Sequence, residues 1–506
     1  MSTLTHLPRR MAVTVSLAFL VGGCAVGPNF HRPATDASER YTRDPLPKQT
    51  VSADAPGGAA QHLVAGQDIP AQWWTAFHSE TLDALIKEAF RANPNVQAAQ
   101  AALRQANDLV WAQRGFFFPT IQASFAPTRQ KNPVGTLAPT LTSGAPIYNL
   151  YTAQLSVGYT LDLFGGNRRM VESLVAQEDM QRFQLEATYL TLSTNVVTAA
   201  VQEAALRAQI AATERMVAVE TEQLQIMQRE VDLGAIAVSD ATAQEVVLAQ
   251  TAALLPPLRK QLAIQRDALS ALLGRLPMQE PSEMFELDKL TLPTELPVSL
   301  PSRIVEQRPD VRMAEEQMHS ACAQVGVAIA DMLPQITFQG TLGGTATTVG
   351  QMFAAGNKFW TVGASLSQTL FAGGTLYHRE RAAVDAMDAA GAQYRGAVIT
   401  AFQNVADTLH TLVFDAQALK ANLDAERAAE QSFGYARKAH DLGSVSYLAL
   451  LNAVQAYQQA VVNRVQAQAN RYADTAALFQ ALGGGWWNRP SGGDGAKGDG
   501  QSSAKQ

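Results

Sequence analysis

Apolar and polar side chains alternate strictly between Gln154 and Leu163. The odd positions are apolar, namely Leu155, Val157, Tyr159, Leu161 and Leu163, and the even positions are polar or glycine. Period-two alternation over about ten residues predicts a β-strand with one apolar face, long enough to cross a bilayer when tilted. Half-buried strands of soluble proteins alternate in the same way, so the segment alone leaves both interpretations open.

A single very long helix is predicted after the glycine turn that follows this strand, Phe164-Gly165-Gly166. The segment 167–233 contains neither proline nor glycine, and at about 1.5 Å per residue it gives a helix of roughly 100 Å. Its apolar stripe consists of Leu185, Tyr189, Leu192, Val196 and Ala200. A polar, almost uncharged stripe consists of Thr188, Thr191, Asn195, Thr198 and Gln202. An ordinary amphipathic helix explains the stripes, but a compact domain does not accommodate its length.

The second half of the chain repeats the plan of the first. Asn93-Pro94 and Arg308-Pro309 each open a helix, and their prolines lie 215 positions apart. Each helix leads to a predicted strand hairpin, at about 120–163 and 335–370, and each hairpin leads to a glycine turn and a long helix. Two similar hairpins at corresponding places favour membrane-crossing strands over half-buried ones.

Both long helices are predicted to end in the same kind of turn, Asp232-Leu233-Gly234 and Asp441-Leu442-Gly443, with glycine where the chain reverses. Return helices follow at 239–273 and 446–482, and Pro256-Pro257 predicts a kink in the first of them. The hairpin loops are long and rich in polar or small residues, and they are expected at 131–151 and 343–359.

These elements set the predicted domain boundaries. The first repeat spans 73–300 and closes with a proline-rich linker, 275–302, which is expected to wrap around the helices. The second repeat spans 303–487, with its long helix at 374–442. Residues 488–506 are mainly glycine, serine, lysine and aspartate, so a disordered tail is expected there.

The N-terminus has the regions of a bacterial signal peptide, predicted over residues 1–23. Arg9 and Arg10 precede an apolar core, which ends in Val21-Gly22-Gly23-Cys24. That end resembles a lipobox, which implies that Cys24 becomes the lipidated first residue of the mature chain. Ala25 follows in place of the aspartate of inner-membrane lipoproteins, so outer-membrane sorting is implied. The alternative is a core cysteine after a helix that is not cleaved.

Residues 24–72 are predicted to be an extended segment that lies on the body of the protein. Trp73 and Trp74 are expected to mark the beginning of folded structure. A short amphipathic helix follows, whose apolar side consists of Leu82, Leu85, Ile86 and Ala89. The second cysteine, Cys322, lies in a helical pattern and is interpreted as a small buried hydrophobe rather than a disulfide partner.

Composition narrows the function classes. The chain has 506 residues, a net charge of −6 and 47% hydrophobic residues, a balance that gives no support to nucleic-acid binding. After the N-terminus there is no apolar run of about eighteen residues, so strands are the expected means of crossing a membrane. The eight histidines lack zinc-ligand spacing, and no phosphate-binding loop or Gly-x-Ser-x-Gly elbow occurs. No enzyme, cofactor or metal is predicted.

Strand edges predict an oligomer. Four strands per chain do not close a barrel, and unpaired edges are not tolerated in lipid. Three chains would supply twelve strands. The predicted fold is therefore an α+β membrane protein, with a trimeric 12-stranded β-barrel continuous with a barrel of long periplasmic helices.

Several segments of the chain resemble the outer-membrane factor family, the TolC- and OprM-like exit ducts of tripartite efflux pumps, and its NodT-like lipoprotein branch. The resemblance covers nearly the whole mature chain. It rests on the segments Cys24-Ala25-Val26-Gly27-Pro28, Arg308-Pro309-Asp310-Val311, the two Leu-Gly turns and Leu482-Gly483-Gly484-Gly485-Trp486. It implies a homotrimer in the outer membrane that extends through the periplasm. It also implies docking to a periplasmic adaptor and an inner-membrane transporter, with the RND type expected.

The resemblance also implies a gate at the periplasmic turns, closed partly by aspartates just beyond the turn glycine. Asp240 matches one such position, whereas the second repeat has Ala449 and Asn452 at the corresponding places. Asp240 is equally well interpreted as a residue favoured by the helix dipole, with Ser239 as the cap. An apolar constriction is predicted from Leu442, Val445 and Tyr447.

The predicted function is an exit duct that conducts exported substrates passively, with energy supplied by the partner transporter. The alternative is a lipid-anchored periplasmic coiled-coil scaffold without a pore. A scaffold shares the lipobox and the long helices, but it gives no reason for a strand hairpin at the head of each long helix.

Overall fold

A computed structural model describes residues 25–34, 40–131 and 147–489. The chain divides into two compact units, and each unit takes residues from both halves of the sequence. The sheet unit comprises residues 1–33, 102–182 and 313–395, and the core unit comprises the remainder. The signal peptide, Cys24, most of the first hairpin loop and the C-terminal tail lie outside the described residues.

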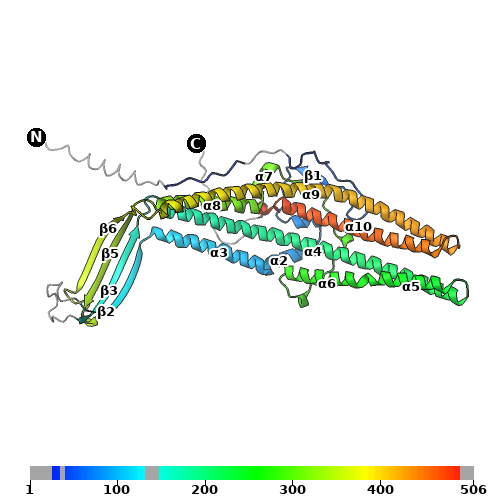
Figure 1. Cartoon of the computed structure of the whole chain (residues 1–506), viewed down its shortest axis with the longest axis horizontal. Helices are drawn as coiled ribbons and strands as arrows, with labels where there is room; N and C mark the ends of the chain where they lie inside the picture. The colour runs from blue at the N-terminus through cyan, green and yellow to red at the C-terminus, as the bar shows by residue number, and fades with distance from the viewer. Residues whose placement is uncertain (1–24, 35–39, 132–146, 490–506) are drawn as a thin grey trace. The chain divides into compact units, whose positions relative to one another are not determined.

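The sheet unit contains four antiparallel strands in the order β2-β3-β5-β6 (Figure 1). Their bounds are Thr120–Lys131, Ile147–Thr160, Gln335–Ala346 and Lys358–Ser367. The strand predicted over 154–163 is β3, which begins earlier and ends at Thr160. The loop expected from residue 343 begins later, because Gly343 and Gly344 belong to β5. A Cβ on Gly343 would lie 2.7 Å from the Ala153 carbonyl oxygen, so glycine permits the close strand contact here.

Two helices of 67 residues each dominate the chain, α4 at Gly166–Asp232 and α9 at Thr375–Asp441. The helices that precede the hairpins are α3, Pro94–Arg114, and α8, Pro309–Ala330. Helix α7 covers Pro301–Gln307. No helix in the described ranges combines the length and the apolar character that membrane crossing requires.

The two return paths differ. The first consists of α5, Val238–Ala253, and α6, Leu255–Leu272, which meet at Leu254. This interruption lies where Pro256-Pro257 predicted a kink, because proline lacks the amide hydrogen that a continuous helix uses. The second return path is one helix, α10, at Tyr447–Ala481.

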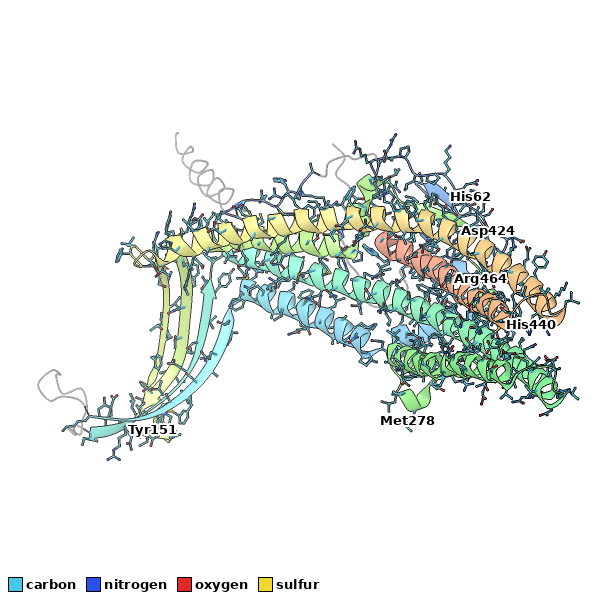
Figure 2. The ribbon with its side chains drawn as sticks, turned by 45° about the vertical axis from the view of Figure 1, so that its right-hand side comes forward. His62, Tyr151, Met278, Asp424, His440 and Arg464 are labelled. Carbon is cyan, nitrogen blue, oxygen red and sulfur yellow. The ribbon has the colours of Figure 1, made fainter. Side chains whose placement is uncertain are left out.

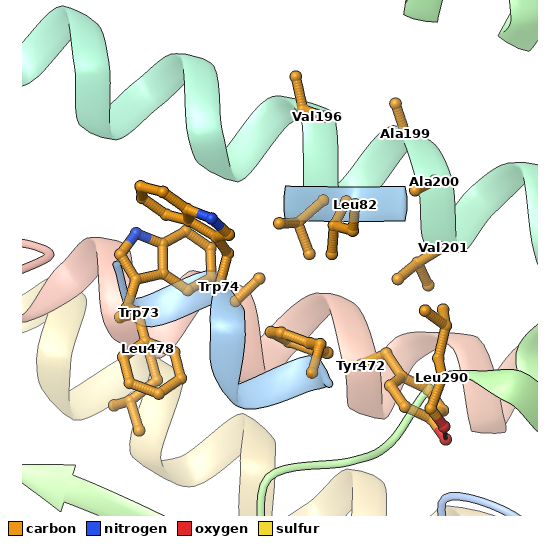
Figure 3. Close-up of a cluster of buried hydrophobic side chains, with 14 of the residues drawn as sticks. Trp73, Trp74, Leu82, Val196, Ala199, Ala200, Val201, Leu290, Tyr472 and Leu478 are labelled. Carbon is orange, nitrogen blue, oxygen red and sulfur yellow. Dashed lines mark hydrogen bonds between the residues drawn. The ribbon is translucent and has the colours of Figure 1, made fainter. Parts of the chain in front are cut away.

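The core unit is built around aromatic residues that join the beginning and the end of the chain (Figure 3). Trp73 in the short helix η1, Trp73–Phe77, stacks on Phe479 of α10 with ring centroids 5.2 Å apart. Helix α2, Glu80–Ala92, buries the four apolar residues predicted for it. The apolar stripe of α4 contributes Val196 and Ala200 to the same core. Thr191, Asn195 and Thr198 of its polar stripe are exposed, as predicted.

Folded structure begins well before Trp73, contrary to the expectation. Strand β1, His62–Ala65, pairs in parallel with β4, Glu295–Val298, in the linker between the halves. Gln61 is fully buried, and its side-chain amide donates to the carbonyl oxygen of Pro293 at 3.0 Å. Buried Arg471 of α10 donates to the carbonyl oxygen of Gly57 at 2.8 Å. These polar contacts hold a segment whose composition suggested only an extended chain.

Candidate functional site

The sheet sorts its side chains into one apolar and one polar face. Strand register aligns one row of residues across all four strands. In order from β2 to β6, the row consists of Ile121, Val157, Gly340 and Val362. The next apolar row consists of Ala123, Leu155, Leu342 and Trp360. Trp360 is 73% exposed and Val362 is 80% exposed within the single chain. Such a continuous exposed apolar surface requires a nonaqueous environment or another covering.

Hydroxyl and amide side chains occupy the other face of the sheet. One row across it consists of Gln122, Ser156, Thr341 and Thr361. Hydroxyl pairs join β3 to β5, with Thr152 and Thr345 at 3.1 Å and Thr160 and Thr337 at 3.2 Å. One apolar and one polar face is the arrangement expected of strands that separate lipid from a water-filled lumen.

Strands β2 and β6 are the edges of this sheet. Among the described residues, each pairs with a neighbour on one side only. Tyr151, on inner strand β3, lies opposite Pro127 of β2 (Figure 2). Backbone donors and acceptors at an open edge remain available for pairing with another chain.

The junction between β3 and α4 depends on Asp162, which the sequence pattern assigned to the polar face of the strand. Its carboxylate accepts hydrogen bonds from the backbone amides of Asn167 at 2.9 Å and Arg168 at 3.0 Å. It also pairs with the guanidinium of Arg168. These bonds satisfy amides at the start of the 67-residue helix, which have no acceptor within the helix itself.

The N-terminal residues 25–33 are held firmly within the sheet unit. Arg169 of α4 donates to the carbonyl oxygen of Val26 at 3.0 Å and to the side chain of Asn29 at 2.8 Å. Phe30 stacks on His319 of α8 at 4.4 Å. Cys322 is buried as a free thiol, in agreement with the interpretation of it as a small hydrophobe.

The second region consists of the two turns, Leu233-Gly234 and Leu442-Gly443, and the first residues of the return helices α5 and α10. This region is called the turn end, and it belongs to the core unit. Asp240 lies in the first turn of α5, a position that the helix dipole favours for a carboxylate. The cap assigned to Ser239 is wrong. Helix α5 begins at Val238, its N-cap is Ala237, and no side chain caps it. Ser239 therefore lies inside the first turn.

The other predicted gate residues occupy different surroundings. Leu442 is 83% exposed at the turn. Val445 and Asn452 line one open groove of about 700 Å³ together with Tyr435 and Ala449. The structure thus brings Val445 and Asn452 to one surface.

Tyr447 is half-buried and packs against a small cluster of Met216, Leu450 and Val454. Burial, and then the nearby Glu220, raise the pKa of Tyr447 to about 12. Its ring lies 5.7 Å from that of His440, in the last turn of α9 (Figure 2). Its apolar contacts are therefore made within the chain.

Glu220 is a notable residue that sequence reasoning missed. It lies on α4 in a charged stretch, yet it is only 3% exposed. Thr251 of α5 and Gln458 of α10 both donate to its carboxyl group. Burial raises the pKa of Glu220 to about 7.

An exposed apolar sheet face joined along the chain to 67-residue helices defines the α+β class of outer-membrane channels. Comparisons with known proteins place the chain more narrowly. The sequence profile described as "Outer membrane efflux protein" matches residues 85–275 and 300–484. The chain belongs to the outer membrane efflux protein family.

Relatives of known name agree with this assignment. The chain is 26% identical over 484 residues to the toluene efflux pump outer membrane protein TtgC of Pseudomonas putida, covering 95% of this chain and 96% of the relative. It is 28% identical over 439 residues to the pyoverdine export outer membrane protein OpmQ of Pseudomonas aeruginosa, covering 84% and 90%. The outer-membrane channel OprN has a similar structure, with a TM-score of 0.80, 26% identity and coverage of 92% and 100%. This protein is an outer-membrane efflux channel component.

Proposed function

We propose that three copies of the chain form a closed duct through the outer membrane and the periplasm. The observation that carries this proposal is the sheet, with its apolar face, its polar face and its two open edges. In lipid an open edge leaves backbone groups without partners, each at a cost of several kcal/mol. Pairing β6 of one chain with β2 of the next removes every edge, and three chains give the twelve-stranded β-barrel predicted from the sequence.

A lipid anchor at Cys24 is part of the proposal, although that residue lies outside the described ranges. Its support is the position of the following residue. A Cβ added to Gly165 would lie 2.6 Å from the Cα of Ala25, so Ala25 packs against the turn between β3 and α4. The amide of Val26 donates to the carbonyl oxygen of Phe164 at 3.0 Å. Acyl chains on Cys24 would therefore begin beside the strand ends, where a membrane boundary is expected.

The duct is proposed to conduct passively. A periplasmic adaptor and an inner-membrane transporter of the RND type would deliver substrates to it and supply the energy. The names of TtgC and OpmQ identify them as outer-membrane proteins of a toluene efflux pump and of pyoverdine export, which supports a role in a larger export assembly.

Asp240 is proposed to contribute to the closed gate at the turn end. Three copies of a carboxylate near a common axis would repel anions and could hold cations or water in a narrow opening. Asn452 is proposed as its uncharged counterpart in the second half, with Leu442, Val445 and Tyr447 as the apolar part of the constriction.

Single-channel conductance in a planar bilayer tests this function, with wild type compared with Asp240→Ala. A small, mostly closed wild-type conductance should rise several-fold in the variant, because a ring of charge is removed. Asp267→Ala is the matched control, since Asp267 is an exposed aspartate on α6 of the same unit. The control should behave as wild type.

Two results would contradict the proposal. A purified protein that fails to insert, or that remains a monomer with a helical spectrum, would favour the coiled-coil scaffold without a pore. A trimer that inserts and conducts freely in all three forms would show a duct that Asp240 does not close.

A further inference from the structure

One carboxyl group links three helices of the core unit near the turn end. Glu220 of α4 accepts hydrogen bonds at Oε1 from the Thr251 hydroxyl of α5 at 3.1 Å and from the Gln458 amide of α10 at 3.2 Å. The Gln458 amide also donates to the Thr251 hydroxyl at 3.1 Å, which closes a triangle. Such a network connects its helices more strongly than separate pairs do, because each bond polarises the others.

The carboxyl group of Glu220 has too few hydrogen-bond donors around it to stabilise a negative charge. Its second oxygen, Oε2, is buried without a hydrogen-bond partner among the described residues. A buried carboxylate needs several donors or a cation, whereas an uncharged carboxylic acid tolerates this environment far better. The geometry therefore suits the protonated form.

Charged, titratable and uncharged groups of the neighbouring helices line the cavity beside Glu220. The cavity beside it is lined by Arg437 of α9 and Tyr447 of α10, and α5 contributes uncharged Gln244 and Val247. Among the described residues no ion pair joins Glu220 to Arg437. The contacts of the carboxyl group are thus hydroxyl and amide donors.

The triangle lies beside the interruption of the first return path. Thr251 is in the last turn of α5, and the helix ends two residues later. The amide of Leu254, where α5 and α6 meet, donates to the Thr251 carbonyl oxygen at 3.1 Å. Gln244, about two helical turns nearer the start of α5, donates to the backbone oxygen of Glu220 at 3.1 Å. Both contacts with Glu220 therefore act on the 16-residue helix between the turn and the break.

We propose that Glu220 is a positioning residue of the gate, whose uncharged carboxyl group holds α5 and α10 against α4 while the turn end is closed. Loss of the proton, or of the carboxyl group, releases α5 to pivot at Leu254. This inference rests on the proposed duct function and adds a means of regulating it. Glu220 need not touch the conducted substrate.

The direction of the pH effect follows from linkage. The pKa of Glu220 lies near 7 in this closed arrangement, against an ordinary value of 4.5. A released α5 would hydrate the carboxyl group and return its pKa toward the ordinary value. The closed form is therefore favoured at acid pH, and it loses that advantage as the pH rises from about 4.5 to about 7. Above that range the effect levels off.

Hydrogen–deuterium exchange of α5, measured on the full-length protein in lipid at pH 5 and pH 8, tests the proposal directly. After correction for intrinsic exchange rates, protection of the α5 amides in wild type should fall by roughly 10- to 100-fold from pH 5 to pH 8. Each unit of the shift from 4.5 to about 7 that is titrated over this range corresponds to about tenfold. Glu220→Gln should keep the same protection at both pH values, because the amide accepts the same bonds and does not ionise. Glu220→Ala should lose protection at both.

Conductance of the same samples separates this inference from the function on which it rests. Wild-type opening should increase from pH 5 to pH 8, and Glu220→Gln should abolish that increase. Glu222→Gln is the matched control, an exposed glutamate on the same helix, and it should keep the wild-type pH dependence.

The pH dependence of Glu220→Gln decides the role of Glu220. If this variant keeps the wild-type dependence, or if Glu220→Ala keeps full protection of α5, the positioning role is wrong. If α5 responds as described but no form conducts, the positioning role is retained and the duct function fails.

Discussion

The two long helices end alike, but the chain returns from them in different ways. At the first turn the amide of Ala235 donates to the Glu230 carbonyl oxygen at 2.8 Å, and at the second Ser444 donates to Ala439 at the same distance. Beyond these turns, one return path is interrupted at Leu254 and the other runs unbroken through α10. A duplicated plan has thus kept its turns and diverged in the continuity of its return helices.

This difference suggests that the return paths of the two halves have different mechanical roles. An interrupted helix can change direction at one point with the loss of few hydrogen bonds, whereas an unbroken helix transmits a displacement along its whole length. Thr251 and Gln244, which bind Glu220, both belong to the interrupted path. The first half is therefore the candidate for gate movement, and α10 is the candidate for its support.

Introducing proline into α10 should have the largest effect on this comparison. Gln459 is exposed on α10, so Gln459→Pro removes a helical hydrogen bond and adds a steric clash without removing a buried side chain. The expected loss of stability is about 3 kcal/mol or more. The double variant Pro256→Ala/Pro257→Ala should change stability by less than about 1 kcal/mol. Thermal loss of the 222 nm circular dichroism signal measures both, and equal tolerance would contradict the proposed role of α10.

A smaller effect is expected at the acidic pair that joins α9 and α10. Burial, and then the hydrogen-bonded carboxyl group of Asp415, raise the pKa of Asp474 to about 8. Because the folded state holds this proton more tightly than the unfolded state, stability falls as the pH rises from about 4 to about 8. Because Asp474 is only partly buried, solvent screening reduces the effect of this shift, and Asp474→Asn should raise stability by at least about 1 kcal/mol at pH 8.5 and change it little at pH 4.

The control for this prediction is Asp424→Asn, at an exposed position on α9 (Figure 2). Denaturant midpoints at the two pH values provide the measurement. A gain in stability that is the same at both pH values would contradict the shared-proton explanation, because it would indicate better packing alone.

The sequence alone predicted the features that depend on local patterns. The segment 167–233 differs by one residue at each end from α4, because glycine and proline mark helix limits without reference to other elements. The four buried residues of α2 followed from their spacing. The interruption before Pro256-Pro257 followed from backbone chemistry.

Features that depend on distant residues were not predicted. Glu220 lies between Glu214 and Glu222, which are exposed, and nothing local distinguishes the one glutamate that Thr251 and Gln458 contact. Ser239 has the chemistry of a cap, but the chain enters α5 two residues earlier than that assignment requires. The gate assignments of Asp240, Asn452, Leu442, Val445 and Tyr447 remain predictions, because they concern surfaces that meet only in an assembly.

Substitution of the two turn glycines should have the smallest effect on stability. It also tests whether the two halves have the same turn structure. Gly234 and Gly443 have φ angles of 73° and 69°, and neither would bring an added Cβ within 4 Å of another group. Alanine at either site therefore incurs only the backbone cost of a left-handed conformation, about 1 kcal/mol. Gly234→Ala and Gly443→Ala should lower the denaturant midpoint by the same amount. Unequal shifts would mean that the turns, like the return helices, have diverged, because open space leaves no difference in packing to explain them.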